Sequence, residues 1–161
     1  MNRLFYSNNA IQQLSSARNN KLKLLRLDRE LSSIQTNIFI LRLKETNGIE
    51  LQLAQFEAQR VENERNHTIA TIASDIYNAI DNAIKAIHSS VQEHNAYMVM
   101  LDDQMLLNIA NFINEYYKND EIKSSIKDRI RFSLISHNII HLSMNSGYFM
   151  PGLQTLQQSI M

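Results

Sequence analysis

The residues that come nearest to a chemical site are two histidines four positions apart, His137 and His141. Side chains with this spacing lie on one face of a helix, so the pair could bind a metal ion. In zinc proteases a glutamate follows the first histidine and acts as the general base, but here Asn138 stands in its place. The sequence offers neither further ligands nor a second shell of hydrogen-bond partners. We therefore expect no metal site, and we interpret both histidines as partly buried polar residues at a helix interface.

The other candidates for catalytic chemistry each lack a necessary part. Glu64 and His67 form a Glu-x-x-His element, but a di-iron bundle needs two such elements and two further glutamates. No other histidine here has a glutamate three residues before it. Asp102 and Asp103 are adjacent, so on a helix they point to different sides and cannot share a proton. Paired serines such as Ser15-Ser16, Ser32-Ser33 and Ser89-Ser90 lack the glycine-flanked strained turn of a nucleophile. These gaps predict a protein without enzymatic activity and without a cofactor.

The scarcity of turn-forming residues indicates the fold class. With 3 Gly and 1 Pro among 161 residues, the chain lacks the turns of a β-sandwich or barrel and the glycines of a phosphate-binding loop. The absence of Cys excludes a disulfide framework, a thiolate nucleophile and a cysteine metal site. Hydrophobic residues make up 44% of the chain, which is too many for a disordered protein. The composition therefore predicts an all-α protein.

The first helix is expected at residues 9–46, and it carries a heptad seam in which apolar residues alternate at spacings of three and four. The seam consists of Leu24, Leu27, Leu31, Ile34, Ile38 and Leu41. Five further apolar residues lie outside the seam, where a two-stranded coiled coil would leave them in water: Leu22, Leu25, Phe39, Ile40 and Leu43. A helix that is apolar on more than one face is usually covered by more than one partner. We therefore expect a helix of a bundle, with the seam residues as an interface.

The remaining helices follow from the same periodicity and from the breaks between them. Asn47 and Gly48 end the first helix, and the pattern resumes at residue 49 and continues to 117. This long segment is either one helix or is broken near 63–68 or near 94–95. Further helices are expected at 120–143 and, as a short last helix, at 153–160. Together these elements predict a single helical domain over 1–161, an elongated three- or four-helix bundle with coiled-coil character.

Charge is distributed unevenly along a chain whose formal net charge is zero. Residues 1–44 hold eight basic and two acidic residues, whereas residues 45–115 hold three basic and eleven acidic ones. We interpret this as basic and acidic segments that pack against one another, within one chain or between copies. A nucleic-acid-binding arm is not expected, because the basic excess is modest and the basic residues alternate with leucine at helical spacing.

The last 30 residues, 132–161, contain no Asp, Glu, Lys or Arg. Serine, asparagine, histidine and glutamine interrupt this segment, so it does not read as a membrane span. Tyr148, Phe149 and Met150 stand in a loop bounded by Gly and Pro, and charge depletion with aromatic enrichment is typical of an interface core. We therefore predict that this segment is the principal contact surface. The alternative is that it folds back onto the helix of residues 69–116 as ordinary core.

These observations favour a non-enzymatic structural or assembly protein that acts as a homo-oligomer or as a subunit of a larger complex. One alternative is a membrane-active helical protein, such as a pore former or a phage ejection or virion protein, although membrane binding is not predicted. A second alternative is a helical adaptor or chaperone that binds one protein partner. The first 14 residues lack the apolar run of a secretory signal, so the expected location is the cytoplasm or the interior of a larger particle.

Overall fold

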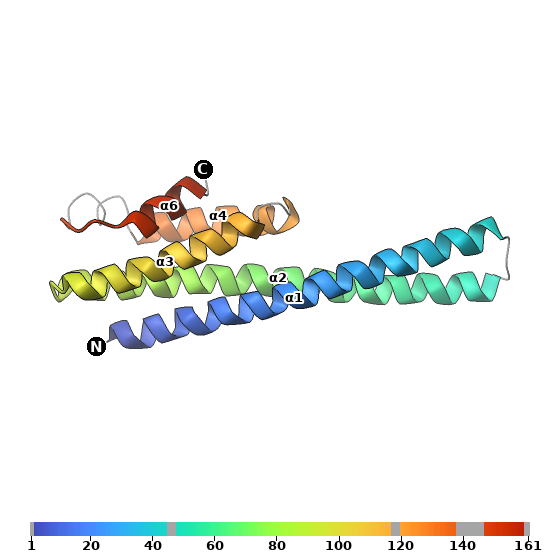
Figure 1. Ribbon diagram of the computed structural model, residues 1–161, viewed down its shortest axis with the longest axis horizontal. Coiled ribbons are helices and arrows are strands. Elements are labelled where there is room, and N and C mark those ends of the chain that lie inside the picture. Colours follow the sequence, from blue (N-terminus) through green and yellow to red (C-terminus); the bar gives the residue numbers. More distant parts are fainter. Residues whose placement is uncertain (1, 45–47, 117–119, 138–146, 160–161) are drawn as a thin grey trace. The chain divides into compact units, whose positions relative to one another are not determined.

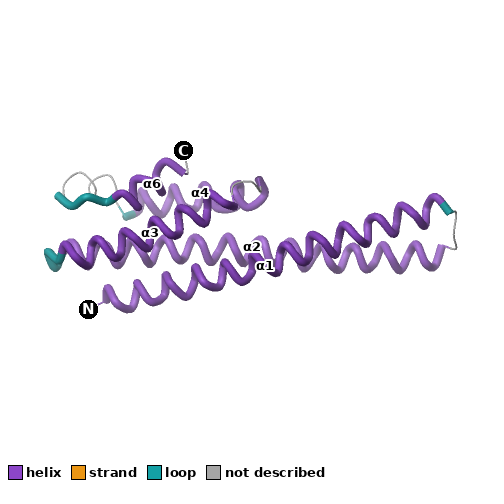
Figure 2. The backbone as a smooth tube through the Cα atoms, viewed as in Figure 1, coloured by secondary structure: helices purple, strands orange, loops and turns teal. Residues whose placement is uncertain are grey.

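The computed structural model describes residues 2–44, 48–116, 120–137 and 147–159. Every regular element in these ranges is a helix, which confirms the all-α prediction; the bundle and coiled-coil character stays a prediction. The helices are α1 (Asn2–Leu43), α2 (Gly48–Gln92), α3 (Ala96–Tyr116), α4 (Asp120–Ser136) and α6 (Pro151–Ser159), as Figures 1 and 2 show. Among the described residues, none of these helices combines the length and apolar content of a membrane span.

The helix boundaries differ from the sequence-based ones where tertiary contacts decide them. α1 begins at Asn2 rather than at residue 9, and within the added segment Arg3 donates two hydrogen bonds to Asp102 of α3. α2 runs without interruption through residues 63–68, and the chain leaves the helix only between Gln92 and Ala96. The expected end of the fourth helix at residue 143 lies outside the described residues.

The break between α2 and α3 has a local cause. His94 adopts a left-handed backbone conformation with φ of 52°, which cannot continue a right-handed helix. Asn95 then accepts a hydrogen bond through its Oδ1 atom from the backbone N–H of Met98, at 3.2 Å. This is the N-cap interaction that satisfies a free N–H in the first turn of a helix, so α3 begins directly after Asn95.

The chain forms two compact units, residues 18–71 and residues 1–17 with 72–161. Each unit contains parts of α1 and α2, since both helices run through the division. Each unit also has buried side chains of its own. The expectation of a single domain stays a prediction.

The larger unit has a core built mainly from isoleucine. Eleven large side chains in the described part of the chain are almost completely buried, and ten of them belong to this unit: Ile72, Ile76, Ile80, Ile84, Ile87, Leu106, Ile109, Ile113, Ile126 and Ile130. Their spacings of three and four place them on the inner faces of α2, α3 and α4. Buried alanines between them on α2, such as Ala79 and Ala83, leave space for the neighbouring helices to approach closely.

The adjacent aspartates of α3 serve two separate contacts in this unit. Asp102 accepts two hydrogen bonds of 2.9 Å from the Arg3 guanidinium and one of 2.6 Å from the Ser90 hydroxyl, and so joins α1, α2 and α3. Asp103 accepts hydrogen bonds of 2.7 and 2.8 Å from the backbone N–H groups of Gly152 and Leu153. The expectation that the two carboxylates point to different sides is confirmed.

α6 is held against α3 by these bonds to Asp103 and by close packing at Gly152. A Cβ atom added at Gly152 would stand 2.1 Å from the backbone oxygen of Asp103 and 2.8 Å from the backbone nitrogen of Leu107. Met150, Leu153 and Leu156 are buried beside this contact. Burial raises the pKa of Asp103, and the hydrogen bonds from the α6 backbone offset this effect only in part. α6 is therefore seated backbone against backbone.

The smaller unit, residues 18–71, is an antiparallel helical hairpin formed by the second half of α1 and the first half of α2 (Figure 1). Leu24, Leu27 and Val61 are buried between the two helices. Ion pairs connect Lys23 to Glu64 and join Arg65 with Asp28. Two helices alone thus enclose a narrow core, and most of each helix surface remains outside it.

Candidate functional site

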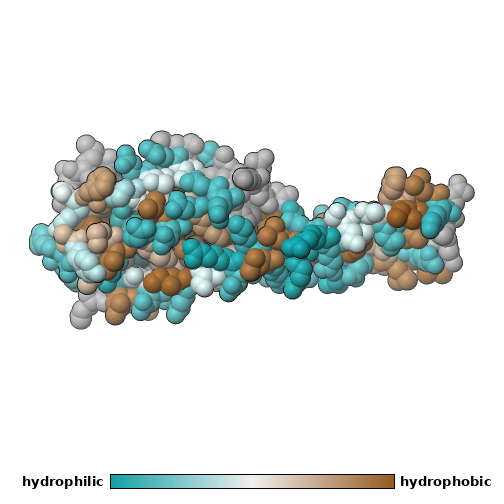
Figure 3. All heavy atoms as spheres, viewed as in Figure 1, coloured by the Kyte–Doolittle hydropathy of each residue, from teal (hydrophilic) through white to brown (hydrophobic). Residues whose placement is uncertain are grey.

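The hairpin of residues 18–71 carries a set of large apolar side chains that the structure leaves in solvent. Their exposed fractions range from 40% to 68%. They are Leu22, Leu25, Phe39, Ile40, Leu43, Ile49, Leu53 and Phe56. Figure 3 shows apolar side chains gathered at the end of the hairpin where α1 ends and α2 begins. Contiguous exposed apolar surface of this kind is typical of an interaction site.

On α1 these side chains follow a second heptad pattern, on the side of the helix away from α2. We call this set the α1 outer stripe, and its members alternate at spacings of three and four. They are Leu22, Leu25, Arg29, Ser32, Thr36, Phe39 and Leu43, and all are exposed. The stripe is apolar at both ends and polar in the middle.

α2 carries a matching pattern, which we call the α2 outer stripe. Its spacings of four and three place all its members on one side of the helix. They are Ile49, Leu53, Phe56, Arg60, Asn63, His67 and Ala70, and all are exposed. The apolar residues of this stripe are confined to the end of the hairpin next to Gly48.

The two outer stripes face in opposite directions. A residue two positions along an α-helix lies about 200° around its axis, so Leu43 points almost directly away from the inner residue Leu41. The same relation holds on α2, where Leu53 follows two positions after the inner residue Leu51. Because the inner residues of each helix face the other helix, the stripes lie on opposite sides of the hairpin.

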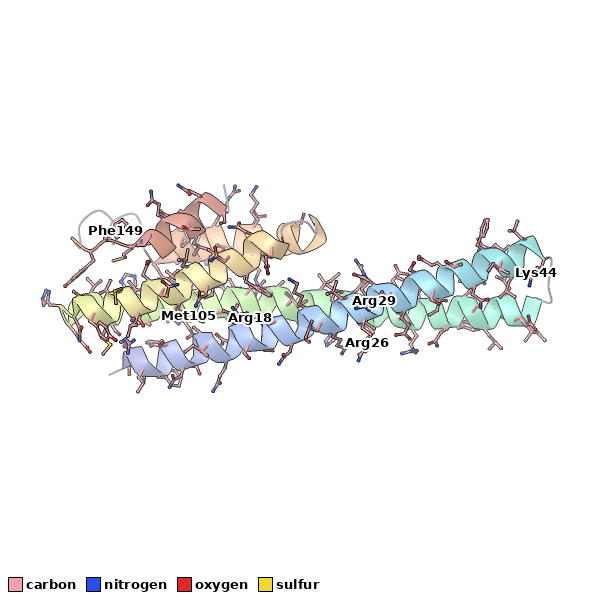
Figure 4. All side chains as sticks on the ribbon, viewed as in Figure 1. Arg18, Arg26, Arg29, Lys44, Met105 and Phe149 are labelled. Carbon is pink, nitrogen blue, oxygen red and sulfur yellow. The ribbon has the colours of Figure 1, made fainter. Side chains whose placement is uncertain are left out.

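The two sides of the hairpin also differ in charge. Residues 18–44 hold seven basic and two acidic residues, whereas residues 48–71 of α2 hold two basic and four acidic ones. Figure 4 labels four of the exposed basic residues of this segment, Arg18, Arg26 and Arg29 on α1 and Lys44 directly after it. The α1 side is therefore basic and apolar, and the α2 side is acidic and apolar.

The charge of Arg60 within the α2 outer stripe is balanced by its own surroundings. Its guanidinium is 2.6 Å from a Glu57 carboxylate oxygen, 3.4 Å from Glu64 and 3.5 Å from Glu30. The hydrogen bond from Arg60 lowers the pKa of the Glu57 carboxyl, and the same bond raises the pKa of Arg60. The acidic character of the α2 side is thus retained around a neutralised arginine.

The heptad seam predicted from the sequence lies on the inner face of the hairpin. Leu24 and Leu27 are buried, and the other four seam residues are half-buried: Leu31, Ile34, Ile38 and Leu41. The sequence also indicated that apolar residues outside the seam, such as Leu22 and Phe39, would be covered by further helices. In the described part of this chain the outer side of this half of α1 is exposed, so the expectation that further helices cover it stays a prediction.

The predicted contact loop is divided between core and surface. Met150 is buried, Tyr148 is half-buried and Phe149 is 83% exposed. α6, which follows the loop, packs on α3 through Leu153 and Leu156. The described part of residues 132–161 thus contributes to the core of the larger unit as well as to its surface, and its role as an interface between proteins stays a prediction.

His137 lies in a polar cluster between α2 and the end of α4, whereas His141 lies outside the described residues. The His137 Nε2 atom is 2.7 Å from Asp81 Oδ1, and the Lys85 ammonium is 3.0 Å from Asp81 Oδ2. The His88 Nε2 atom is 3.0 Å from the carbonyl oxygen of His137. Burial opposes the ionisation of Asp81, but the hydrogen bonds from His137 and Lys85 outweigh it and hold the pKa of Asp81 below its usual value.

The contacts of this cluster connect α2 to the C-terminal end of α4. The Ser133 hydroxyl donates to the same Asp81 carboxylate at 3.5 Å. Within the ranges that the structure describes, no three side chains of the metal-binding types come together. A nearby hollow of about 300 Å³ is lined by Tyr77, Asp128, Arg129 and Phe132, and the Arg129 guanidinium stacks over the Tyr77 ring at 4.6 Å. Arg129 is thereby engaged by the protein itself.

Comparison with protein-family models, curated proteins and solved structures finds no match to this chain. The outer stripes are the feature of the structure that points to a function, and the sequence predicts them only in part. The apolar residues of α1 outside the seam point to its stripe. The spacing of Ile49, Leu53 and Phe56 is the corresponding signal on α2.

Proposed function

We propose that this protein is a non-enzymatic assembly protein that acts as a homo-oligomer and uses the hairpin of residues 18–71 as its assembly surface. The observation that carries this proposal is the exposed apolar surface of the hairpin. Of the seventeen large hydrophobic residues that are exposed in the described part of the chain, eight fall between Leu22 and Phe56.

The size of this surface supports the proposal. Phe39 and Phe56 are each exposed by more than 60%, and at roughly 200 Å² for a phenylalanine side chain the two present about 250 Å² of apolar area. Six aliphatic residues add to this area. Phe39 and Phe56 belong to different outer stripes, so this apolar area is divided between two opposite sides of the hairpin, and each side offers a surface to a different neighbouring copy.

The chemistry of the polar groups supports a non-enzymatic role. Asp102 and Asp103 are occupied by contacts within the fold, to Arg3 and to the backbone of α6. Asp81 is occupied by His137 and Lys85. A catalytic carboxylate needs access to a substrate, and these three carboxylates are instead bound to partners that stabilise helix packing.

Light scattering coupled to size-exclusion chromatography tests the proposal. The full chain at tens of micromolar should have a mass that is a multiple of 18.7 kDa. A variant with Phe39→Ser and Phe56→Ser should have the mass of a single copy. It should keep its helical circular dichroism spectrum, since both side chains are exposed. The matched control is Phe132→Ser, because Phe132 is 68% exposed and lies outside the hairpin.

Two results would contradict the proposal. One is a wild-type chain with the mass of a single copy over this concentration range. The other is a double variant that assembles as wild type does. Flotation with liposomes separates the membrane-active alternative, because an assembly protein stays with the aqueous fraction.

A further inference from the structure

We propose that copies of this chain associate by placing the α1 outer stripe of one copy on the α2 outer stripe of the next, with the two helices antiparallel. This inference rests on the proposed assembly function and names the partner as a second copy of the chain. It also names the register, in which the residue numbers of facing positions add up to 92.

The periodicities of the two stripes match in this register. Each stripe has seven positions, and the order of spacings along α1 is the reverse of the order along α2. Two of the three positions nearest the end of the hairpin then bring apolar residues together, since Leu43 faces Ile49 and Phe39 faces Leu53. At the third position Thr36 faces Phe56. A shift by one heptad would place Phe39 against Arg60 or Arg29 against Phe56, and would leave apolar residues facing charge.

The ion pairs inside the hairpin indicate that, in this register, neighbouring copies lie side by side with no shift along the hairpin axis. Glu30 is bound to Arg60, Asp28 to Arg65 and Lys23 to Glu64, so residues at about the same height on α1 and α2 have numbers that add up to between 87 and 93. Two copies that stand side by side in the same orientation therefore meet in the proposed register. Their apolar ends coincide without any displacement along the hairpin.

Charge complementarity selects α2 as the helix that α1 contacts. Residues 18–44 carry a net charge of +5 and residues 48–71 a net charge of −2. Contact of α1 with α1 would bring two basic segments together, and contact of α2 with α2 would bring two acidic segments together. Only the mixed contact pairs opposite charges across the interface.

Individual charged residues are also placed so that opposite charges meet across the proposed contact. Arg26 is exposed at the edge of the α1 outer stripe, and Arg29 is exposed within it. At matching height the next copy has the half-buried Glu64 beside its α2 outer stripe, where Glu64 also pairs with Lys23 and Arg60 of its own copy. On the other edge α2 presents Gln52 and Gln59, which repel no charge. The proposed contact therefore brings opposite charges together along one edge and places neutral amides along the other.

The opposite directions of the two stripes determine the kind of assembly. Each copy uses its α1 stripe toward one neighbour and its α2 stripe toward another, so the contact is heterologous. Contacts of this type generate rings when the rotation closes and open chains when it does not. Each stripe spans 22 residues, about 32 Å of helix, so the contact is small and the mass should rise with concentration.

Disulfide cross-linking of the full chain tests the proposal directly, because the native sequence has no cysteine. Two single variants, Phe39→Cys and Leu53→Cys, are oxidised separately and as an equal mixture. Random collision gives twice as much mixed adduct as either homodimer. We expect the mixed adduct to exceed this ratio at least fivefold, since the two positions face each other only across the proposed contact.

The matched control is the pair Asn37→Cys and Gln55→Cys. These positions are also exposed, and their numbers also add up to 92, but they lie outside both stripes. Their mixture should give no more mixed adduct than random collision. The comparison therefore separates facing stripes from mere proximity of two hairpins.

Three results would overturn the inference. Predominant self-linking of Phe39→Cys would indicate a two-fold contact of α1 with α1, and mixed adduct at the level of the control would indicate no contact between the stripes. In both cases, if light scattering still gives a mass that is a multiple of one copy, the proposed assembly function holds and only the proposed register is wrong. The mass of a single copy, with or without binding to vesicles of anionic lipid, would contradict both the assembly function and the register.

Discussion

Replacement of Gly152 by alanine tests whether α6 is seated on the backbone of α3. The added Cβ atom would stand 2.1 Å from the backbone oxygen of Asp103 and 2.8 Å from the backbone nitrogen of Leu107. Neither atom belongs to a flexible side chain, so relief requires α6 to move away from α3. That movement stretches the hydrogen bonds that the Asp103 carboxylate accepts from Gly152 and Leu153.

The magnitude follows from these contacts. Insertion of a methyl group into a tightly packed site typically costs about 1–3 kcal/mol, and a weakened hydrogen bond to a charged group costs about 1.5–3 kcal/mol more. Alanine in place of glycine restricts the unfolded chain and returns about 0.4–1 kcal/mol. We therefore expect Gly152→Ala to lower the free energy of unfolding by about 2–4 kcal/mol, with the loss centred on α6.

Urea denaturation measures this free energy, and hydrogen exchange measures where the loss occurs. The backbone N–H groups of the first turn of α6 should exchange faster in the variant, whereas those of the hairpin should not change. Gly48→Ala is the control, because a Cβ atom at Gly48 would have no neighbour within 4 Å. Equal stability of Gly152→Ala and wild type would refute the close seating of α6.

Three further predictions concern charged residues. Arg26→Glu should lower the assembled mass in light scattering at low salt, and the difference from wild type should shrink in 1 M salt, where the Debye length falls to about 3 Å. Asp102→Asn should cost about 3–5 kcal/mol in urea denaturation, because it leaves the Arg3 guanidinium without its carboxylate; a cost below 1 kcal/mol would contradict this role. Asp81 has a lowered pKa in the folded state, so its contribution is present above its unfolded pKa of about 3.9 and is lost as the pH falls through the lower folded value. Asp81→Asn should therefore be destabilising in urea denaturation at pH 7, and its cost should decrease as the pH is lowered below the unfolded pKa.

The fold class and the inner faces of the helices could be predicted from the sequence, because they follow from local properties. The scarcity of Gly and Pro predicts helices, and the seam from Leu24 to Leu41 predicts the side of α1 that contacts another helix. The start of α1 at Asn2 could not be predicted in this way. It depends on Arg3, which meets Asp102 across 99 positions of sequence.

Only part of the candidate site could be predicted from the sequence. Spacing identifies apolar residues outside the seam, such as Leu22 and Phe39, but it does not say whether another helix covers them. Covering depends on which helices pack along α1, and that is a property of the whole chain. The roles of Asp102 and Asp103 were missed for the same reason, since each carboxylate has partners far away in sequence.

The contact between Asp103 and α6 has a consequence for the order in which the protein folds. α6 has nine residues, and an isolated helix of this length is not stable in water. Its N-terminal N–H groups are capped by a side chain 49 and 50 positions earlier, so the cap exists only once α3 has formed. α6 must therefore become helical as it docks, and a refolding experiment should record its amide protection after that of α3.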